Sequence, residues 1–367
     1  MGNGTYYHFS IKSEVELLLQ NDKENKTPKT LLLVVGIDGL PLTTNPPSQL
    51  WPILGAYFGK TKPSDSNSFL LQFVNEMNEL FYTGVTYNNN HVNVILHALI
   101  CDIPAKSFVL NTKGHTGKNS CVRCTITGEW SKRRVCFPDL DCPMRSHQSF
   151  ITYEDKMYHL GETILTKIPK NNISSSIPYD YMHLNCIGVL KKLLLFWIHK
   201  KHDLNLPSQL VTVIDNKFKF LSSYIPVEFQ RKTNEYSRMH PMRDVNRWKA
   251  SELRQCLLYT GIVVFQNIVK KEVYNHFVVL SVAIRILLVK CTDYFNNYAN
   301  LLLRQFIVAF KSLCGQSYIS HNIHALCHQA EDAKKYGSLE RISAFPFENF
   351  MQPLKRDVRT GVKPLQQ

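Results

Sequence analysis

The sequence lacks any apolar run long enough to cross a membrane. A spanning helix needs about 20 consecutive apolar residues, and the most apolar stretches, 189–198 and 277–289, are interrupted by Lys191, Lys192 and Arg285. The chain also lacks the apolar segment of a secretory leader near its start, an internal repeat and a long low-complexity tract. These absences predict a soluble intracellular protein whose apolar stretches are core helices.

Acidic residues are scarce relative to basic ones. The 367-residue chain has 29 Asp and Glu against 43 Lys and Arg, which gives a formal net charge of +14. A basic excess of this size favours a polyanion as partner, with nucleic acid first. The alternative is a basic surface that is only solvated.

The cysteines lack the regular spacing of a disulfide framework. Ten Cys are scattered along the chain, and without a leader segment reduced thiols are expected. One pair stands out, because Cys121-Val122-Arg123-Cys124 has the spacing with which two thiolates bind one metal ion. Two thiolates leave a tetrahedral zinc site half complete.

Two histidines can supply the other half. His324 and His328 lie in the predicted helix 323–336, where residues four apart share a face. We therefore predict a closed, structural Zn²⁺ site made of Cys121, Cys124, His324 and His328. Two alternatives stay open: a four-cysteine site that uses Cys121, Cys124, Cys136 and Cys142, and reduced cysteines beside a surface helix.

Two apolar runs each end at an acid. Residues 31–37 are almost all apolar and precede Asp38, and residues 92–100 come shortly before Asp102. Both runs are typical of buried strands, and 68–82 between them has a helical period. This order of strand, link, helix and strand predicts an α/β fold.

A third acid, Glu348, lies within an aromatic, apolar segment, 343–350. Together with Asp38 and Asp102 it could hold two divalent cations, Mg²⁺ or Mn²⁺. One cation would activate a water or a 3′-hydroxyl, and the other would stabilise the leaving oxygen of a phosphodiester. The alternative is that Asp38 and Asp102 only cap or turn the chain.

Two shorter patterns could act beside such a site. Asp180 and His183 form a D-x-x-H element at a predicted helix start, where Asp180 is a plausible N-cap and His183 could contact phosphate or order an acid. Arg247, Trp248 and Lys249 could meet a phosphate backbone or a stacked base. An ordinary helix with ion pairs is the alternative for the second pattern.

The middle of the chain is predicted to be mostly helical. The candidate helices are 182–202, 210–221, 247–270, 274–290 and 291–312. We predict four parts: an N-terminal extension and linker (1–30), the first part of a core (31–124), a mainly helical insertion (125–319), and the C-terminal part of the core (320–367).

Taken together, these segments resemble DDE transposases of the CACTA (En/Spm) group, in the form of transposase-derived genes of animal genomes. The similarity covers nearly the whole chain. It is carried by IDGLPL (37–42), WPILG (51–55), CDIPA (101–105), GHTG with CVRC (114–124), DYMHL (180–184), RWKASELRQ (247–255), HALCH (324–328) and FPFENF (345–350).

The resemblance implies an RNase H-like catalytic core split by a large α-helical insertion. It implies a nuclear, DNA-binding protein that could form a homo-oligomer and that cleaves and joins DNA strands through a two-metal site at Asp38, Asp102 and Glu348, with zinc at the Cys and His residues. The alternative is a catalytically inactive, domesticated DNA-binding or protein-interaction module. The stretch after Gly55 is shorter than in the family, which predicts a lost or truncated core strand.

Overall fold

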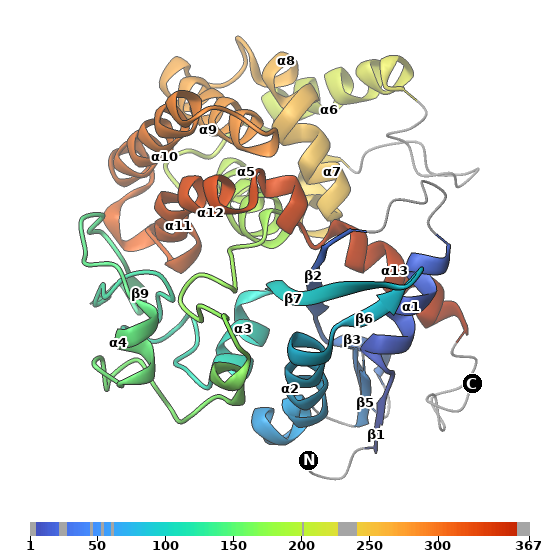
Figure 1. The fold of residues 1–367 in the computed structure, drawn as a ribbon. Helices are drawn as coiled ribbons and strands as arrows, with labels where there is room; N and C mark the ends of the chain where they lie inside the picture. Colours follow the sequence, from blue (N-terminus) through green and yellow to red (C-terminus); the bar gives the residue numbers. More distant parts are fainter. Residues whose placement is uncertain are drawn as a thin grey trace. The chain divides into compact units, whose positions relative to one another are not determined.

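The chain has a mixed α/β fold, as predicted, in a computed structural model that describes residues 5–21, 28–44, 47–52, 55–59, 62–199, 202–226 and 241–357. It divides into two compact units, each assembled from separate segments of the chain (Figure 1). Unit 1 comprises Met1–Thr127, Cys142–Tyr179 and Ala344–Gln367, and unit 2 comprises Gly128–Asp141 and Asp180–Ser343.

These units differ from the predicted division at several places, and the predicted N-terminal extension and linker (1–30) is part of unit 1. Cys142–Tyr179 belongs to unit 1, where the Leu99 N–H donates to the Ser176 carbonyl at 2.9 Å. Residues 320–343 belong to unit 2, where the buried side-chain amides of Asn185 and Gln329 bond to each other at 2.8 and 2.6 Å. Such contacts between distant segments are invisible to sequence periodicity.

A small sheet in unit 1 has the strand order β2-β7-β6. Its strands are β2 (Thr30–Ile37), β6 (Val85–Tyr87) and β7 (Asn90–Cys101). β2 and β7 are parallel, so the chain crosses between them through α2 (Ser66–Thr83). β7 is buried at every position from 98 to 101, which explains why its end reads as a continuous apolar run.

A second, antiparallel sheet in unit 1 has the order β1-β5-β4-β3. Its strands are β1 (Thr5–His8), β3 (Leu40–Thr44), β4 (Pro47–Pro52) and β5 (Gly55–Gly59). β5 pairs with β4 on one side and with β1 on the other. The stretch that begins at Gly55 therefore forms a short strand, so the expectation of a lost strand is wrong, and that of a truncated one stays a prediction.

Helix α2 illustrates how local signals set the two ends of a helix in unit 1. Asp65 accepts hydrogen bonds from the N–H groups of Asn67 and Ser68 at the start of α2, and Gly84, with φ of 57°, ends it. The side of α2 that carries Phe69 and Phe73 is fully buried. The other unit 1 helices are α1 (Ile11–Gln20), α3 (Ile103–Leu110), α4 (His147–Ile151) and α13 (Phe345–Asp357).

Unit 2 is mainly helical around an aromatic core. Trp197 packs edge to face on Phe265, and Phe265 on Phe277, with ring centroids 4.9 and 5.1 Å apart. Its elements are β8 (Glu129–Ser131), β9 (Arg134–Cys136), a π-helical segment (Met182–Leu190), α5 (Lys191–Ile198), α6 (Ser208–Leu221), α7 (Ala250–Gln255), α8 (Gly261–Phe265), α9 (Lys271–Leu288), α10 (Asp293–Cys314), α11 (His321–Ala325) and α12 (Gln329–Tyr336). Among the helices of the described residues, none is long and apolar enough to cross a membrane.

A buried histidine in this core predicts acid sensitivity. The His276 ring of α9 stacks on Phe306 of α10 at 4.0 Å, and its Nε2 donates to the Phe306 carbonyl at 3.0 Å. Burial lowers the pKa of His276 to about 4, although the hydrogen bond opposes this shift. The unfolded chain therefore binds a proton below pH ~6.5 that the folded chain does not bind until pH ~4.

We expect stability to be fully present above pH ~6.5 and to fall as the pH drops toward ~4, by about 3 kcal/mol for this group. His276→Gln keeps a hydrogen-bond donor but does not titrate, so it should flatten that part of the profile. Urea unfolding at several pH values measures the difference, with exposed His115→Gln as the control. Equal pH dependence in wild type and His276→Gln would contradict the assignment.

Candidate functional site

The first half of the candidate metal centre is the Cys121–Cys124 turn. Both side chains are buried. The Cys124 N–H donates to the Cys121 sulfur at 3.5 Å, and the Tyr179 hydroxyl lies 3.6 Å from the same sulfur. Burial, and then the charge of Cys121, raise the pKa of Tyr179 well above its ordinary value. The phenol therefore stays protonated and is able to donate to a Cys121 thiolate.

The second half is a histidine pair, with His324 in α11 and His328 in the 3₁₀ turn (Leu326–His328) that follows it. His324 and His328 are both buried, and their Nε2 atoms lie 3.3 Å apart. Two nitrogens that bind one tetrahedral zinc at 2.0–2.1 Å lie about 3.3–3.4 Å from each other. The spacing of the two rings is therefore the one that a shared metal ion requires.

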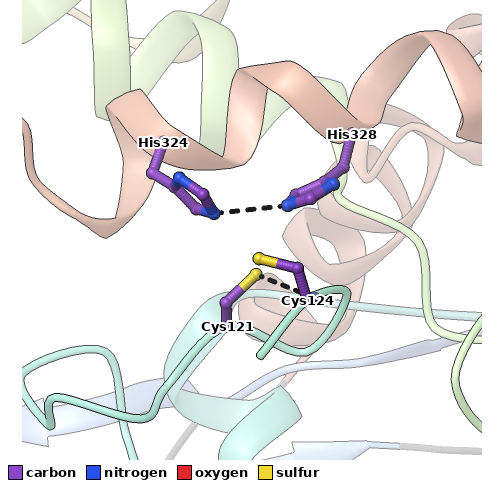
Figure 2. A group of neighbouring side chains, drawn as sticks. All are labelled: Cys121, Cys124, His324 and His328. Atoms are coloured by element: carbon purple, nitrogen blue, oxygen red, sulfur yellow. Dashed lines mark hydrogen bonds between the residues drawn. The ribbon is translucent and has the colours of Figure 1, made fainter. Parts of the chain in front are cut away.

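The four predicted zinc ligands come together in the structure. The ligand atoms of Cys121, Cys124, His324 and His328 all lie within 4.8 Å of one another (Figure 2). Two thiolates and two imidazoles form a donor set suited to zinc, and four protein ligands make a closed, structural site. The prediction of a buried Cys₂His₂ cluster able to bind a metal such as zinc is confirmed.

The alternative four-cysteine set does not form within the described residues. The Cys136 thiol donates instead to the Glu129 carbonyl at 3.5 Å. Among the described residues, neither Cys136 nor Cys142 belongs to a group of side chains close enough to share a metal ion. Burial, and then Glu129, raise the pKa of Cys136, which disfavours the thiolate that a metal needs.

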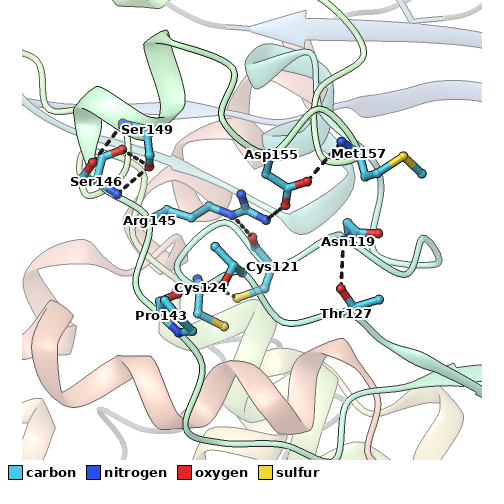
Figure 3. Close-up of polar contacts among 11 residues, drawn as sticks. Asn119, Cys121, Cys124, Thr127, Pro143, Arg145, Ser146, Ser149, Asp155 and Met157 are labelled. Carbon is cyan, nitrogen blue, oxygen red and sulfur yellow. Dashed lines mark hydrogen bonds and ion pairs between the residues drawn. The ribbon is translucent and has the colours of Figure 1, made fainter.

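Buried cations surround the cysteine turn. Arg145 donates through Nε to the Cys121 carbonyl at 3.0 Å and through Nη2 to Asp155 at 2.7 Å (Figure 3). Arg123 donates to the Ser174 carbonyl at 2.5 Å, and Lys106 to the Pro178 carbonyl at 2.8 Å. The sequence did not predict these buried cations, because a single buried Arg or Lys does not follow a helix or strand period.

Asp38 and Asp102 follow neighbouring strands at the same edge of the sheet. β2 ends at Ile37 and β7 at Cys101, and these two residues are partners in the parallel register. Asp38 accepts a hydrogen bond from the Gly39 N–H at 2.7 Å. Asp102 caps α3 by accepting from the Ala105 N–H at 2.7 Å. The prediction that both acids lie at strand ends is confirmed, and so is the local capping role of Asp102.

Glu348 lies in the first turn of α13, beside a residue that packs on β2. A Cβ atom at Gly36 would lie only 2.6 Å from the Phe347 ring, so the ring occupies the space that a side chain would take. Gly36 is two residues before Asp38, and Phe347 directly precedes Glu348. This packing brings the start of α13 to the strand end that carries Asp38. The sequence offered no signal for it other than a glycine inside an apolar strand.

The three acids do not form a closed cluster. Within the described residues, the side chains close enough to share a metal ion are those of the Cys₂His₂ cluster, and Asp38, Asp102 and Glu348 form no such group. The structure therefore brings the backbone positions near one another without assembling a ready metal cage. Mg²⁺ or Mn²⁺ at these residues stays a prediction.

The contact between Gly36 and Phe347 gives a stability prediction. Gly36→Ala should lower the free energy of unfolding by about 1–3 kcal/mol, because the new methyl group overlaps the ring. In a Phe347→Ala background the same change should cost little, since the ring is gone. Gly114→Ala is the control, because its Cβ would meet only the Ser107 hydroxyl at 4.0 Å. Additive costs in the urea-unfolding double-mutant cycle would contradict this packing.

The D-x-x-H element forms a hydrogen-bonded pair between the buried Asp180 carboxylate and the His183 ring. Asp180 accepts from the N–H groups of Met182 and His183 at 3.1 and 2.7 Å, and its Oδ2 lies 2.7 Å from His183 Nδ1. The capping role of Asp180 is confirmed. The same carboxylate orients the partly exposed His183 ring, while contact of His183 with phosphate stays a prediction.

The Arg247-Trp248-Lys249 segment is only partly available to a ligand. Trp248 is 3% exposed, packs edge to face on Phe218 and donates from its indole N–H to the Pro241 carbonyl at 3.2 Å. It is therefore a core residue and does not stack on a base. Arg247 and Lys249 are exposed, and their contact with DNA stays a prediction.

No protein-family model and no curated protein matches the chain.

Proposed function

We propose that the protein is a transposase-derived, DNA-binding protein with a DDE-type site for metal-dependent strand cleavage and strand transfer in an RNase H-like core. The observation that carries the proposal is the pairing of Ile37 with Cys101, which sets Asp38 and Asp102 side by side at the ends of parallel strands. The packing of Phe347 on Gly36, next to Glu348, supports the third acid. The chain order of strand, antiparallel strands, helix and parallel strand supports the proposal, whereas the separation of β2 from the sheet of β3, β4 and β5 does not.

The roles of the residues follow from their chemistry. Carboxylate oxygens are hard ligands, so Asp38, Asp102 and Glu348 would hold Mg²⁺ or Mn²⁺. Bound there, the two ions would activate the attacking water or 3′-hydroxyl and stabilise the leaving oxygen. The hydrogen bonds to Asp38 and Asp102 fix both carboxylates before substrate binds. The net charge of +14 would attract the DNA backbone.

A second function is a DNA-binding or protein-interaction module without catalysis. The observation that favours it is the absence of a closed carboxylate cluster among the described residues. In both functions the Cys₂His₂ cluster would hold a structural zinc ion. A DNA substrate would also imply nuclear localisation, and a homo-oligomer is expected because strand transfer acts on two transposon ends.

Nicking of supercoiled plasmid DNA tests the proposal. Purified protein should nick the plasmid with Mg²⁺ or Mn²⁺ and should not with EDTA. Salt-dependent DNA binding without nicking would overturn the catalytic function and support the inactive module.

A further inference from the structure

The β8–β9 hairpin in unit 2 has a strained and strongly basic tip. Ser131 pairs with Arg134, so Lys132 and Arg133 form a two-residue turn. Their φ angles are 45° and 63°, both in the left-handed region. Turns of this kind normally use Asn-Gly, since most side chains disfavour positive φ. Two adjacent cations here hold a conformation that their own backbone resists, which is a feature of functional positions.

An aromatic side chain lies beside this tip. Trp130 is 63% exposed, whereas Trp197 and Trp248 are buried. Leaving the large apolar surface of a tryptophan in water is unfavourable in free energy. Contact with a flat partner would cover that surface. Trp130 is two residues before Lys132, so one end of the hairpin presents a ring and two positive charges together.

The base of the hairpin is firmly anchored within unit 2. Phe137 is fully buried, and its N–H donates to the Ile319 carbonyl at 2.8 Å. The Gln316 amide donates to Glu129 at 3.2 Å, and the Arg134 guanidinium lies 4.4 Å from the centre of the Tyr318 ring. The tip is therefore an exposed extension of a fixed support, and within the described residues no acid forms an ion pair with Lys132 or Arg133.

We propose that this hairpin is a nucleic-acid contact in which Lys132 and Arg133 bind neighbouring phosphates and Trp130 stacks on an unpaired base. Surfaces that bind single strands combine two components: cations that contact the phosphate backbone of the nucleic acid, and aromatic side chains on which its bases stack. The inference deepens the proposed function, since strand cleavage and transfer produce DNA ends whose bases are accessible. It assigns to Trp130 the stacking role that the buried Trp248 does not fill.

Fluorescence anisotropy with a labelled single-stranded oligonucleotide and a blunt duplex tests the proposal on the full chain. Trp130→Ala should weaken single-strand binding roughly 5- to 100-fold and leave the duplex nearly unchanged. For the single strand, Lys132→Ala/Arg133→Ala should reduce the slope of log affinity against log salt concentration by about 1.4. This is the change expected when two phosphate contacts are lost, at about 0.7 for each. Phe220→Ala and Lys270→Ala/Lys271→Ala remove an exposed aromatic and two exposed cations elsewhere in unit 2, and should change neither quantity.

A further variant separates binding from folding. Lys132→Asn/Arg133→Gly installs the residues that the turn prefers, so its Tm should equal or exceed that of the wild type while binding weakens. Unchanged binding by this variant or by Trp130→Ala would overturn the hairpin proposal alone. A wild-type chain that binds neither oligonucleotide at low salt would overturn the hairpin and the proposed function together, whereas intact hairpin-dependent binding without plasmid nicking would overturn only catalysis.

Discussion

Cys121→Ser is expected to remove one zinc ion per chain and to lower the free energy of unfolding by roughly 4 kcal/mol or more. The physical reason is that the four ligand atoms are buried and lie within 4.8 Å of one another. Without the ion, the Cys124 thiol, the new hydroxyl and two imidazoles remain buried with no shared metal to hold them together. Zinc content measured by atomic absorption and urea unfolding measure the two effects, and His328→Ala should reproduce them.

Two other cysteines provide matched controls for this experiment. Cys136→Ser and Cys142→Ser should keep the full zinc content, because neither residue joins the cluster. Zinc loss in either control would favour the four-cysteine site instead. Full zinc content in Cys121→Ser would contradict the Cys₂His₂ assignment.

Asp102→Asn is expected to reduce metal-dependent nicking by about 10³-fold or more, since it removes a metal-binding charge that acts jointly with the other acids. Asparagine is the sharper choice than alanine because it is an equally good N-cap, so it can still accept the Ala105 N–H at the start of α3. The Tm should therefore change little. Asp38→Asn and Glu348→Gln should each cause a loss of similar size, and the double variants should lose little more.

Asp65→Asn is the matched control for these variants. Asp65 is also an N-cap aspartate of unit 1, at the start of α2, but it belongs to no proposed site. Its substitution should leave nicking unchanged. Equal nicking by the wild type and Asp102→Asn, in protein that has been shown to fold, would mean that the carboxylates are assigned wrongly or that a contaminating nuclease is responsible.

Local patterns predicted the parts of the candidate sites well. The apolar runs before Asp38 and Asp102 are strands, and 68–82 lies within α2. The spacing of Cys121 and Cys124, and of His324 and His328, also predicted the two halves of the metal cluster. These predictions succeeded because strand and helix periodicity, helix capping and two-cysteine turns are set by neighbours in the chain.

Trp130, which is exposed, and Trp248, which is buried, show what the sequence could not predict. Trp248 lies between two cations in RWK and Trp130 lies near three in WSKRR, and the sequence favoured Trp248 as the DNA contact. Packing against Phe218 buries Trp248, whereas Trp130 stays exposed beside a turn that residue preferences do not predict. Burial depends on which distant elements cover a side chain, and neither composition nor period carries that information.

The sequence by itself determined the net charge, the mixed α/β class, the strand-end acids and the two candidate pairs of metal ligands. Only the tertiary structure decided that the cysteine and histidine pairs share one cluster and that Cys136 stays outside it. It also decided that Phe347 takes the place of a side chain at Gly36, which brings the start of α13 to the end of β2. The reason is the same in each case: a ligand set or a packing contact joins residues far apart in the chain, and their distance is fixed by the core between them.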